Sequence, residues 1–194
     1  MKYNLLLFTA ALLLLSAATV FEVNFLAYKP PVPYSRWRTI TFYDFKGYKR
    51  PGETLFGSTA FAFIKTNRET RLINDTTVEA TSYFHPSRSY VFEQQIRSPD
   101  LLEHELYHFH ITEYCTRLLK KELMDYKLPF TQSKLEEMDE KYTLFENNMQ
   151  MTYDDETYHS YVLKEQKKWE KFIDSSLVQL ELYSAPVIWF KKNR

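Results

Sequence analysis

The chain has 194 residues, its 25 Lys and Arg residues balance 25 Asp and Glu residues, and 44% of its residues are hydrophobic. This length suits one well-packed domain, and the hydrophobic content excludes a disordered chain. Because the charges cancel, no overall field attracts nucleic acid, and we expect no nucleic-acid partner. The single cysteine, Cys115, excludes an internal disulfide framework.

Residues 1–18 have the layout of an export signal. Lys2 supplies a positive charge, residues 5–15 form an apolar run, and residues 16–18 are the small residues of a cleavage site. The alternative is an uncleaved N-terminal anchor, because an apolar run of about 17 residues is the lower limit for crossing a bilayer. We expect an exported protein, located in the periplasm, in the cell envelope or outside the cell, and attached to a membrane if this segment is retained.

Residues 19–36 are expected to form a linker, because three prolines between residues 27 and 36 favour an extended backbone. Beyond this linker the pattern becomes typical of strands. Four segments are rich in β-branched and aromatic residues, namely residues 38–42, 58–66, 77–84 and 89–92. We therefore expect an antiparallel sheet in the N-terminal part of the domain.

A long helix is expected to follow. Ser98 is a suitable N-cap, Pro99 suits the first helical position, and no Pro or Gly interrupts residues 100–128. A capping box at residues 133–136 indicates a second helix. Apolar residues at helical spacing over residues 162–177 indicate a third.

Strands followed by helices indicate an α+β fold, with an N-terminal antiparallel β-sheet, one long helix and then two further helices. The domain is expected to span residues 37–183, and residues 184–194 are expected to form a C-terminal tail. A polar segment, residues 153–159, is expected to form the junction before the last helix.

The long helix carries the pattern His-Glu-x-x-His at residues 104–108. Residues four apart lie one above the other on a helix, so His104 and His108 share a face and can bind one Zn²⁺. Glu105 stands where it can accept a proton from water bound to zinc. The alternative is that these are ordinary helix residues. The motif favours metal-assisted hydrolysis.

A catalytic zinc ion normally has three protein ligands and one position open to water. We expect His159 to be the third metal ligand, because a returning helix could bring the polar junction to the motif. Other candidates for this role are Glu113, Asp155 and Glu156. Glu113 lies about 140° around the helix from His108 and points poorly at the metal. Asp155 could instead cap the last helix.

The remaining candidate residues have more ordinary explanations. His110 lies nearly opposite His108 on the helix, so we expect it not to be a ligand. His85 lies in a turn and could reach the cleft, but we expect it to be exposed to solvent. Tyr153 and Tyr158 could stabilise an oxyanion through a phenol hydroxyl, although core packing is the default for either.

The chain contains three segments that resemble the signatures of one bacterial family, and they occur in the same order as in that family. These segments are residues 40–47, 101–111 and 153–159. They resemble the signatures of a domain-of-unknown-function family described as predicted secreted zinc-dependent proteases. Residues 40–47 resemble its aromatic-Asp-Phe-x-Gly signature, and residues 101–111 resemble its motif helix. Residues 153–159, followed by Gln166 and Trp169, resemble its Tyr-Asp-x-x-Thr-x-His segment.

The chain departs from the family pattern at four positions. The family has Gln, Gly and Asp where this chain has Leu106, Tyr107 and His110. It has Gly after the downstream histidine, where this chain has Ser160.

The resemblance implies an exported, zincin-like metallopeptidase that acts on a peptide or protein substrate. His104, His108 and His159 would bind Zn²⁺, and Glu105 would be the general base. The alternative is a non-catalytic cell-envelope binding protein with a structural or vestigial metal site. An amidase acting on cell-wall peptide would use the same chemistry.

Overall fold

The computed structural model describes residues 24–48, 54–55, 58–59, 61–92, 95–126 and 131–189. The expected export signal at residues 1–18 lies outside these ranges. Within them, no helix has the length and apolar character needed to span a bilayer.

The main sheet is built around β6 (Thr77–Phe84), which coincides with a predicted strand. β5 (Thr66–Asn74) pairs with one edge of β6, while β1 (Val32–Pro33) and β8 (Val187–Trp189) share its other edge. All of these pairings are antiparallel. The expected α+β class with antiparallel sheets is therefore confirmed.

Two of these strands come from segments that were expected to lie outside the domain. β1 belongs to the expected linker, and β8 belongs to the expected C-terminal tail. Both segments fill an edge of β6 that would otherwise leave backbone groups unpaired. The extended backbone that the prolines impose suits β1 to this role.

β5 was not predicted beyond Thr66. Its residues include Arg68, Glu69 and Arg71, which obscure the alternation of polar and apolar residues. Such a sequence suits an edge strand with many accessible side chains. The predicted strand at 58–66 is instead divided between short pieces, β3 (Ser58–Thr59), β4 (Ala62–Phe63) and the start of β5.

The short strands form two additional antiparallel pairs. β2 (Thr54–Leu55) pairs with β3, and β4 pairs with β7 (Tyr90–Val91). β7 lies within the predicted strand at 89–92. A 3-10 turn, η4 (Pro86–Arg88), connects β6 to β7 at the expected turn.

The predicted strand at 38–42 is wrong. This part of the chain forms two 3-10 turns, η2 (Tyr34–Thr39) and η3 (Phe42–Asp44), after an earlier one, η1 (Phe25–Ala27). The Asp44 carboxylate accepts hydrogen bonds from the backbone N–H and the hydroxyl of Thr41, at 3.0 and 3.1 Å. These bonds close a turn that a strand could not accommodate.

The glycine of the 40–47 signature has a packing reason. A Cβ atom on Gly47 would lie 2.8 Å from the backbone carbon of Arg88 and 2.9 Å from the backbone of Ser89. The Gly47 N–H donates to the Ser89 carbonyl at 2.7 Å. Phe42 and Phe45 are buried in the core, so residues 42–47 serve the fold.

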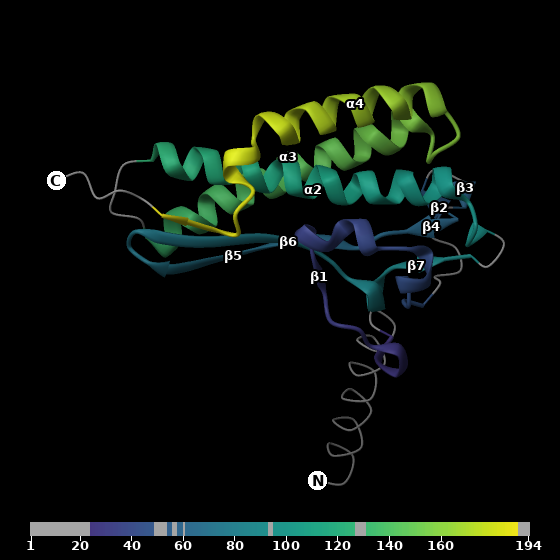
Figure 1. The fold of residues 1–194 in the computed structure, drawn as a ribbon, viewed down its shortest axis with the longest axis horizontal. Coiled ribbons are helices and arrows are strands. Elements are labelled where there is room, and N and C mark those ends of the chain that lie inside the picture. Colours follow the sequence, from purple (N-terminus) through teal and green to yellow (C-terminus); the bar gives the residue numbers. More distant parts are fainter. Residues whose placement is uncertain are drawn as a thin grey trace, which may run out of the picture.

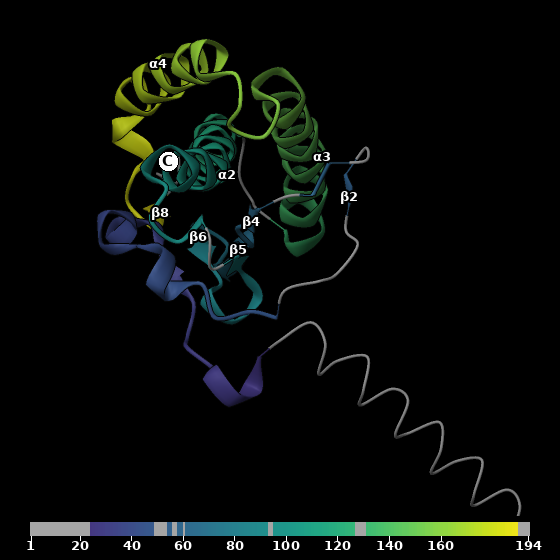
Figure 2. The ribbon, with the colours of Figure 1, turned by 90° about the vertical axis from the view of Figure 1, so that its right-hand side faces the viewer.

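Three helices cover one side of the sheet (Figure 1). They are α2 (Pro99–Asp125), α3 (Gln132–Thr157) and α4 (Leu163–Gln179), and α4 is followed by η6 (Glu181–Tyr183). Seen end-on, α2 lies on the sheet, α4 lies on the side of α2 away from the sheet, and α3 lies beside α2 and also reaches β5 (Figure 2). α2 is therefore buried on several sides. Cys115 on this helix is buried in an apolar cluster that also includes residues of α3 and α4.

Two predicted features of α3 are wrong. The N-cap is Thr131, whose side chain accepts from the Lys134 N–H, so the predicted capping box at 133–136 does not begin the helix. The helix also continues through Thr157, so most of the expected junction at 153–159 is helical. The turn between α3 and α4 is shorter than the predicted junction, and three of its residues have positive φ angles.

Candidate metal centre

Three histidine rings and one carboxylate meet where α2 faces the end of α3. The Asp154 Oδ1 atom lies 3.1 Å from His104 Nε2, 3.0 Å from His108 Nε2 and 3.2 Å from His159 Nδ1. The His104 and His108 Nε2 atoms are 3.3 Å apart. The structure thus brings together the three histidines that the sequence singled out.

This cluster has the donor set of a metal site. His104, Asp154 and His159 each offer one ligand atom, and these atoms lie within 4.8 Å of one another, so the group could hold a metal ion. Ligand atoms at about 2.0–2.1 Å from a tetrahedral zinc ion lie about 3.3 Å apart. Four separations in the cluster, between 3.0 and 3.3 Å, are close to that value, although His108 is not one of the three residues whose ligand atoms all lie within 4.8 Å of one another. Imidazole nitrogens and a carboxylate oxygen also suit zinc chemically.

His108 is oriented by Gln150 on α3. The Gln150 side-chain N–H donates to the His108 carbonyl at 2.9 Å, which fixes the amide so that its oxygen faces His108 Nδ1. Nδ1 of His108 therefore donates to Gln150, and Nε2 faces the centre of the cluster. Such an outer partner fixes the tautomer and the ring orientation of a metal-binding histidine.

His104 is oriented mainly by packing. Its ring stacks on Tyr153, with 4.7 Å between centroids and 18° between planes, and only 1% of the residue is exposed. The Tyr153 hydroxyl donates to the His104 carbonyl at 3.4 Å. Tyr153 is fully buried, as the core-packing alternative expected. His104 Nδ1 is buried and has no hydrogen-bond partner among the described residues.

The charges of the cluster are coupled through Asp154. Burial would raise the pKa of Asp154, but the surrounding histidines outweigh it and hold this pKa well below its ordinary value. Burial lowers the pKa of His104 to about 4. Burial also acts to lower the pKa of His108, but Asp154 outweighs it and raises this pKa to about 9. The hydrogen bond to Asp154 raises the pKa of His159. The carboxylate therefore favours positive charge at this point.

Glu105 is a second carboxylate in the same cavity. It is 4% exposed, and its Oε2 atom accepts a hydrogen bond from the Ile64 N–H at 2.8 Å, just after β4. Burial raises the pKa of Glu105 to about 7. A carboxyl group with this pKa can both accept and return a proton near neutral pH.

His159 lies in a left-handed turn. Tyr158, His159 and Ser160 have φ values of 49°, 50° and 75°. Each non-glycine residue in this conformation costs about 1–2 kcal/mol. Strain of this kind persists where the surrounding structure holds it, often at functional sites. The turn directs His159 back to Asp154, and the φ of Ser160 is one that glycine adopts without steric cost.

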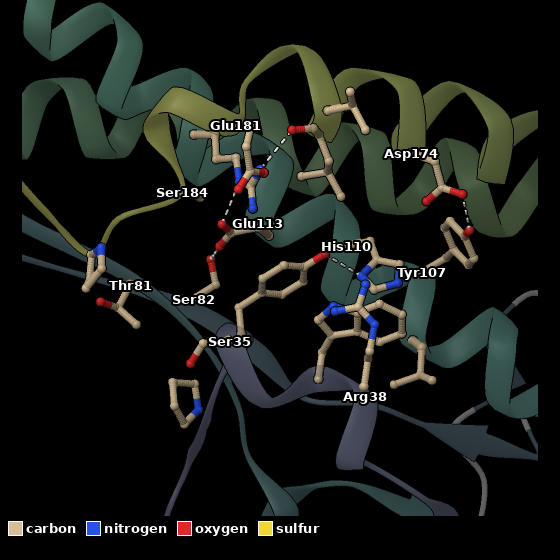
Figure 3. A pocket seen from close by; sticks show the side chains of 18 of the residues that line it. Ser35, Arg38, Thr81, Ser82, Tyr107, His110, Glu113, Asp174, Glu181 and Ser184 are labelled. Carbon is tan, nitrogen blue, oxygen red and sulfur yellow. Dashed lines mark hydrogen bonds and ion pairs between the residues drawn. The ribbon is translucent and has the colours of Figure 1, made fainter.

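The cluster and Glu105 line a cavity of about 500 Å³. A larger cavity, of about 1010 Å³, lies on another side of α2 (Figure 3). His110 and Glu113 line that cavity, where His110 Nδ1 is 2.8 Å from the Tyr34 hydroxyl and Glu113 pairs with Arg117 at 2.8 Å. Both residues therefore point away from the cluster, as expected from their helical positions.

The other candidates also lie outside the cluster. Asp155 is exposed within α3, so it does not cap α4. The Glu156 carboxylate accepts from the Trp169 ring N–H at 2.7 Å. His85 is half-buried, contrary to the expected exposure, and its ring faces Asn67.

Sequence reasoning missed Asp154. The residue was assigned to a junction, and its carboxylate was not considered as a ligand. The available signal was helical spacing, because Glu146, Gln150 and Asp154 recur every four residues and share one face once α3 is continued to Thr157. This face lies against α2 and β5 and carries the partners of the motif histidines.

Comparison with models of protein families, with curated proteins and with solved structures finds no match to this chain.

Proposed function

We propose that this protein is an exported, zinc-dependent peptidase of the secreted bacterial family that its signatures resemble. The observation that carries the proposal is the convergence of three imidazole nitrogens on Asp154 Oδ1, in a cavity that Glu105 also lines. His104, His108 and His159 would hold the metal, with the motif helix and the turn after α3 as the two supports. A bound zinc ion supplies Lewis-acid polarisation and lowers the pKa of water.

Glu105 would be the general base of the reaction. Its raised pKa, about 7, suits it to take a proton from the attacking water and return it to the leaving amine. The hydrogen bond from the Ile64 N–H holds one carboxylate oxygen, and the other has no hydrogen bond among the described residues. The substrate would be a peptide or protein, bound along the open cavity.

The test is zinc content and hydrolysis, measured for the wild-type protein and for Glu105→Gln. The glutamine keeps an oxygen that can accept from Ile64, but it cannot take a proton. We expect one zinc per chain by elemental analysis in both proteins, and a loss of at least 100-fold in peptide hydrolysis in the variant, within the range of general-base contributions. Hydrolysis retained by Glu105→Gln would exclude the assigned base.

One observation favours a second candidate, a structural metal site. If Asp154 binds the metal together with all three histidines, the site has four protein ligands and no position for water. Cobalt substitution separates the two functions. Acetohydroxamate added to the cobalt protein should change its visible spectrum if a position is open, whereas an unchanged spectrum favours the structural site.

A further inference from the structure

Exposed aromatic side chains line the cavity beside the candidate metal centre. Phe61 precedes β4, and Tyr158 and Tyr161 belong to the turn after α3. Their exposed fractions are 36%, 63% and 65%, so the rings are accessible to a ligand. All three residues line the cavity that contains His104 and Glu105.

The three rings form one continuous strip, which we call the aromatic rim (Phe61, Tyr158 and Tyr161). The ring centroids of Phe61 and Tyr161 are 6.5 Å apart, and those of Tyr158 and Tyr161 are also 6.5 Å apart. Phe63 lines the same cavity, but its ring stacks on Tyr90 at 5.8 Å. The rim therefore joins the segment before β4, which contains Phe61, to the turn after α3, which contains Tyr158 and Tyr161.

The backbone places this rim next to the metal-capable residues. Tyr158 precedes His159 directly and has a φ of 49°, which is unfavourable for a bulky residue. The same turn thus directs His159 toward Asp154 and leaves Tyr158 and Tyr161 exposed at the cavity edge. The apolar strip and the polar cluster share one support, so a ligand could contact both at once.

We propose that the aromatic rim binds an aromatic or large aliphatic side chain of a peptide substrate, next to the bond that is cleaved. This inference rests on the proposed peptidase function. A cavity of about 500 Å³ falls within the 300–1,000 Å³ typical of sites for small ligands, and it suits a short peptide segment. Rings in such a cavity supply apolar contact, while the buried polar groups orient the backbone.

Peptide binding tests this inference separately from hydrolysis. The zinc-loaded Glu105→Gln protein is titrated with two fluorescein-labelled, blocked hexapeptides that are identical except for a central Phe or Ser. We expect at least tenfold tighter binding of the Phe peptide. Tyr161→Ala and Phe61→Ala in this background should each weaken the Phe peptide about fivefold and leave the Ser peptide unchanged.

Two further variants serve as controls. Tyr161→Phe keeps the ring and should keep the preference, which separates ring contact from loss of folding. Tyr43→Ala removes a ring that is 63% exposed but does not line this cavity, and it should have no effect.

The outcomes separate the two proposals. Binding that prefers Phe and depends on the rim, together with no hydrolysis by the wild-type protein, supports the rim and contradicts the peptidase function. Equal affinity for both peptides, or unchanged binding in both alanine variants, overturns the rim inference even if hydrolysis is observed.

Discussion

Glu105 and Asp154 are two carboxylates on one cavity, and their surroundings push their pKa values in opposite directions. Burial raises the pKa of Glu105 to about 7, whereas the three histidines outweigh burial at Asp154 and keep its pKa low. Titratable groups whose pKa values are pushed apart identify acid–base roles. Glu105 is suited to carry a proton, and Asp154 is suited to remain charged beside a cation.

At residue scale, the strained turn predicts that Ser160→Gly stabilises the protein. Ser160 has a φ of 75°, which glycine adopts without steric cost, although glycine also loses more entropy on folding. We expect a net gain of about 1 kcal/mol, or roughly 2–4 °C in the melting temperature, measured by differential scanning calorimetry. As a matched control, Ser175→Gly inside α4 should lower stability by about 0.5 kcal/mol. A loss of stability in Ser160→Gly would contradict the assigned strain.

The burial of Lys120 leads us to expect that the free energy of unfolding depends on pH. It is 1% exposed and donates to the Ala185 carbonyl at 2.9 Å. Burial lowers its pKa from 10.5 to about 8, while the charge of Glu113 acts to raise this pKa and that of Arg117 acts to lower it. Between about pH 8 and 10.5 the unfolded chain binds this proton and the folded chain does not. The contribution of Lys120 to the free energy of unfolding therefore rises with pH across this window.

The variant Lys120→Met should lack this rise, because it has no proton to lose. Urea denaturation at several values across this pH range measures the difference from the wild-type protein. Lys121→Met, which changes an exposed neighbour, should keep the wild-type slope. A wild-type slope in Lys120→Met would show that other groups cause the dependence.

At the scale of elements, one polar face of α3 connects the sheet to the candidate metal centre. Arg68 on β5 donates to Asp139 at 2.6 Å and to Glu146 at 3.2 Å. Glu146 accepts from the Thr112 hydroxyl at 2.7 Å, and Gln150, one turn further on, contacts His108. This face therefore fixes how α3 lies against α2, and with it the position of Asp154.

We expect replacement of Arg68 to lower the free energy of unfolding substantially. Its side chain is 2% exposed, so Arg68→Met leaves Asp139 and Glu146 without their buried cation. Removing one partner of a buried ion pair costs about 3–5 kcal/mol. We expect a loss of about 3 kcal/mol by chemical denaturation.

Arg71 offers a control on the same strand. Its side chain is 71% exposed and pairs with Glu79 at 2.6 Å. Arg71→Met should change stability by less than about 1 kcal/mol. Equal losses in the two variants would contradict a special role for the Arg68 cluster.

At the scale of the whole molecule, α2 separates two cavities with different contents. The smaller cavity holds the histidine cluster, and the larger holds His110 and Glu113. The cluster also joins two parts of the chain that are about 50 residues apart, because α2 supplies His104 and α3 supplies Asp154. A metal bound there would cross-link the helical layer.

Metal removal should therefore destabilise the whole domain. A ligand that binds only the folded state stabilises it by about 2.7 kcal/mol at 100 times its Kd. For a chain of this size, that corresponds to a fall of roughly 5–10 °C in the melting temperature after treatment with EDTA. Adding zinc back should restore the value. A protein whose melting temperature is the same with EDTA and with zinc would contradict the metal centre.

The sequence by itself predicted those parts that depend on short spacings. The four-residue separation of His104 and His108 places them on one face of any helix, and the absence of Pro and Gly over 100–128 indicated that helix. β6 was predictable because it is rich in β-branched and aromatic residues, and its buried side chains fall mostly on one face of the strand. The polar segment at 153–159 pointed to His159.

Only the tertiary structure decided what those residues meet. The position of Asp154 depends on how far α3 extends and on its packing against α2, and no local spacing contains that information. The same holds for β1 and β8, whose backbone pairs with β6 from distant parts of the chain. Local patterns determine elements because they act through neighbouring residues, whereas long-range convergence is determined by the packing of whole surfaces.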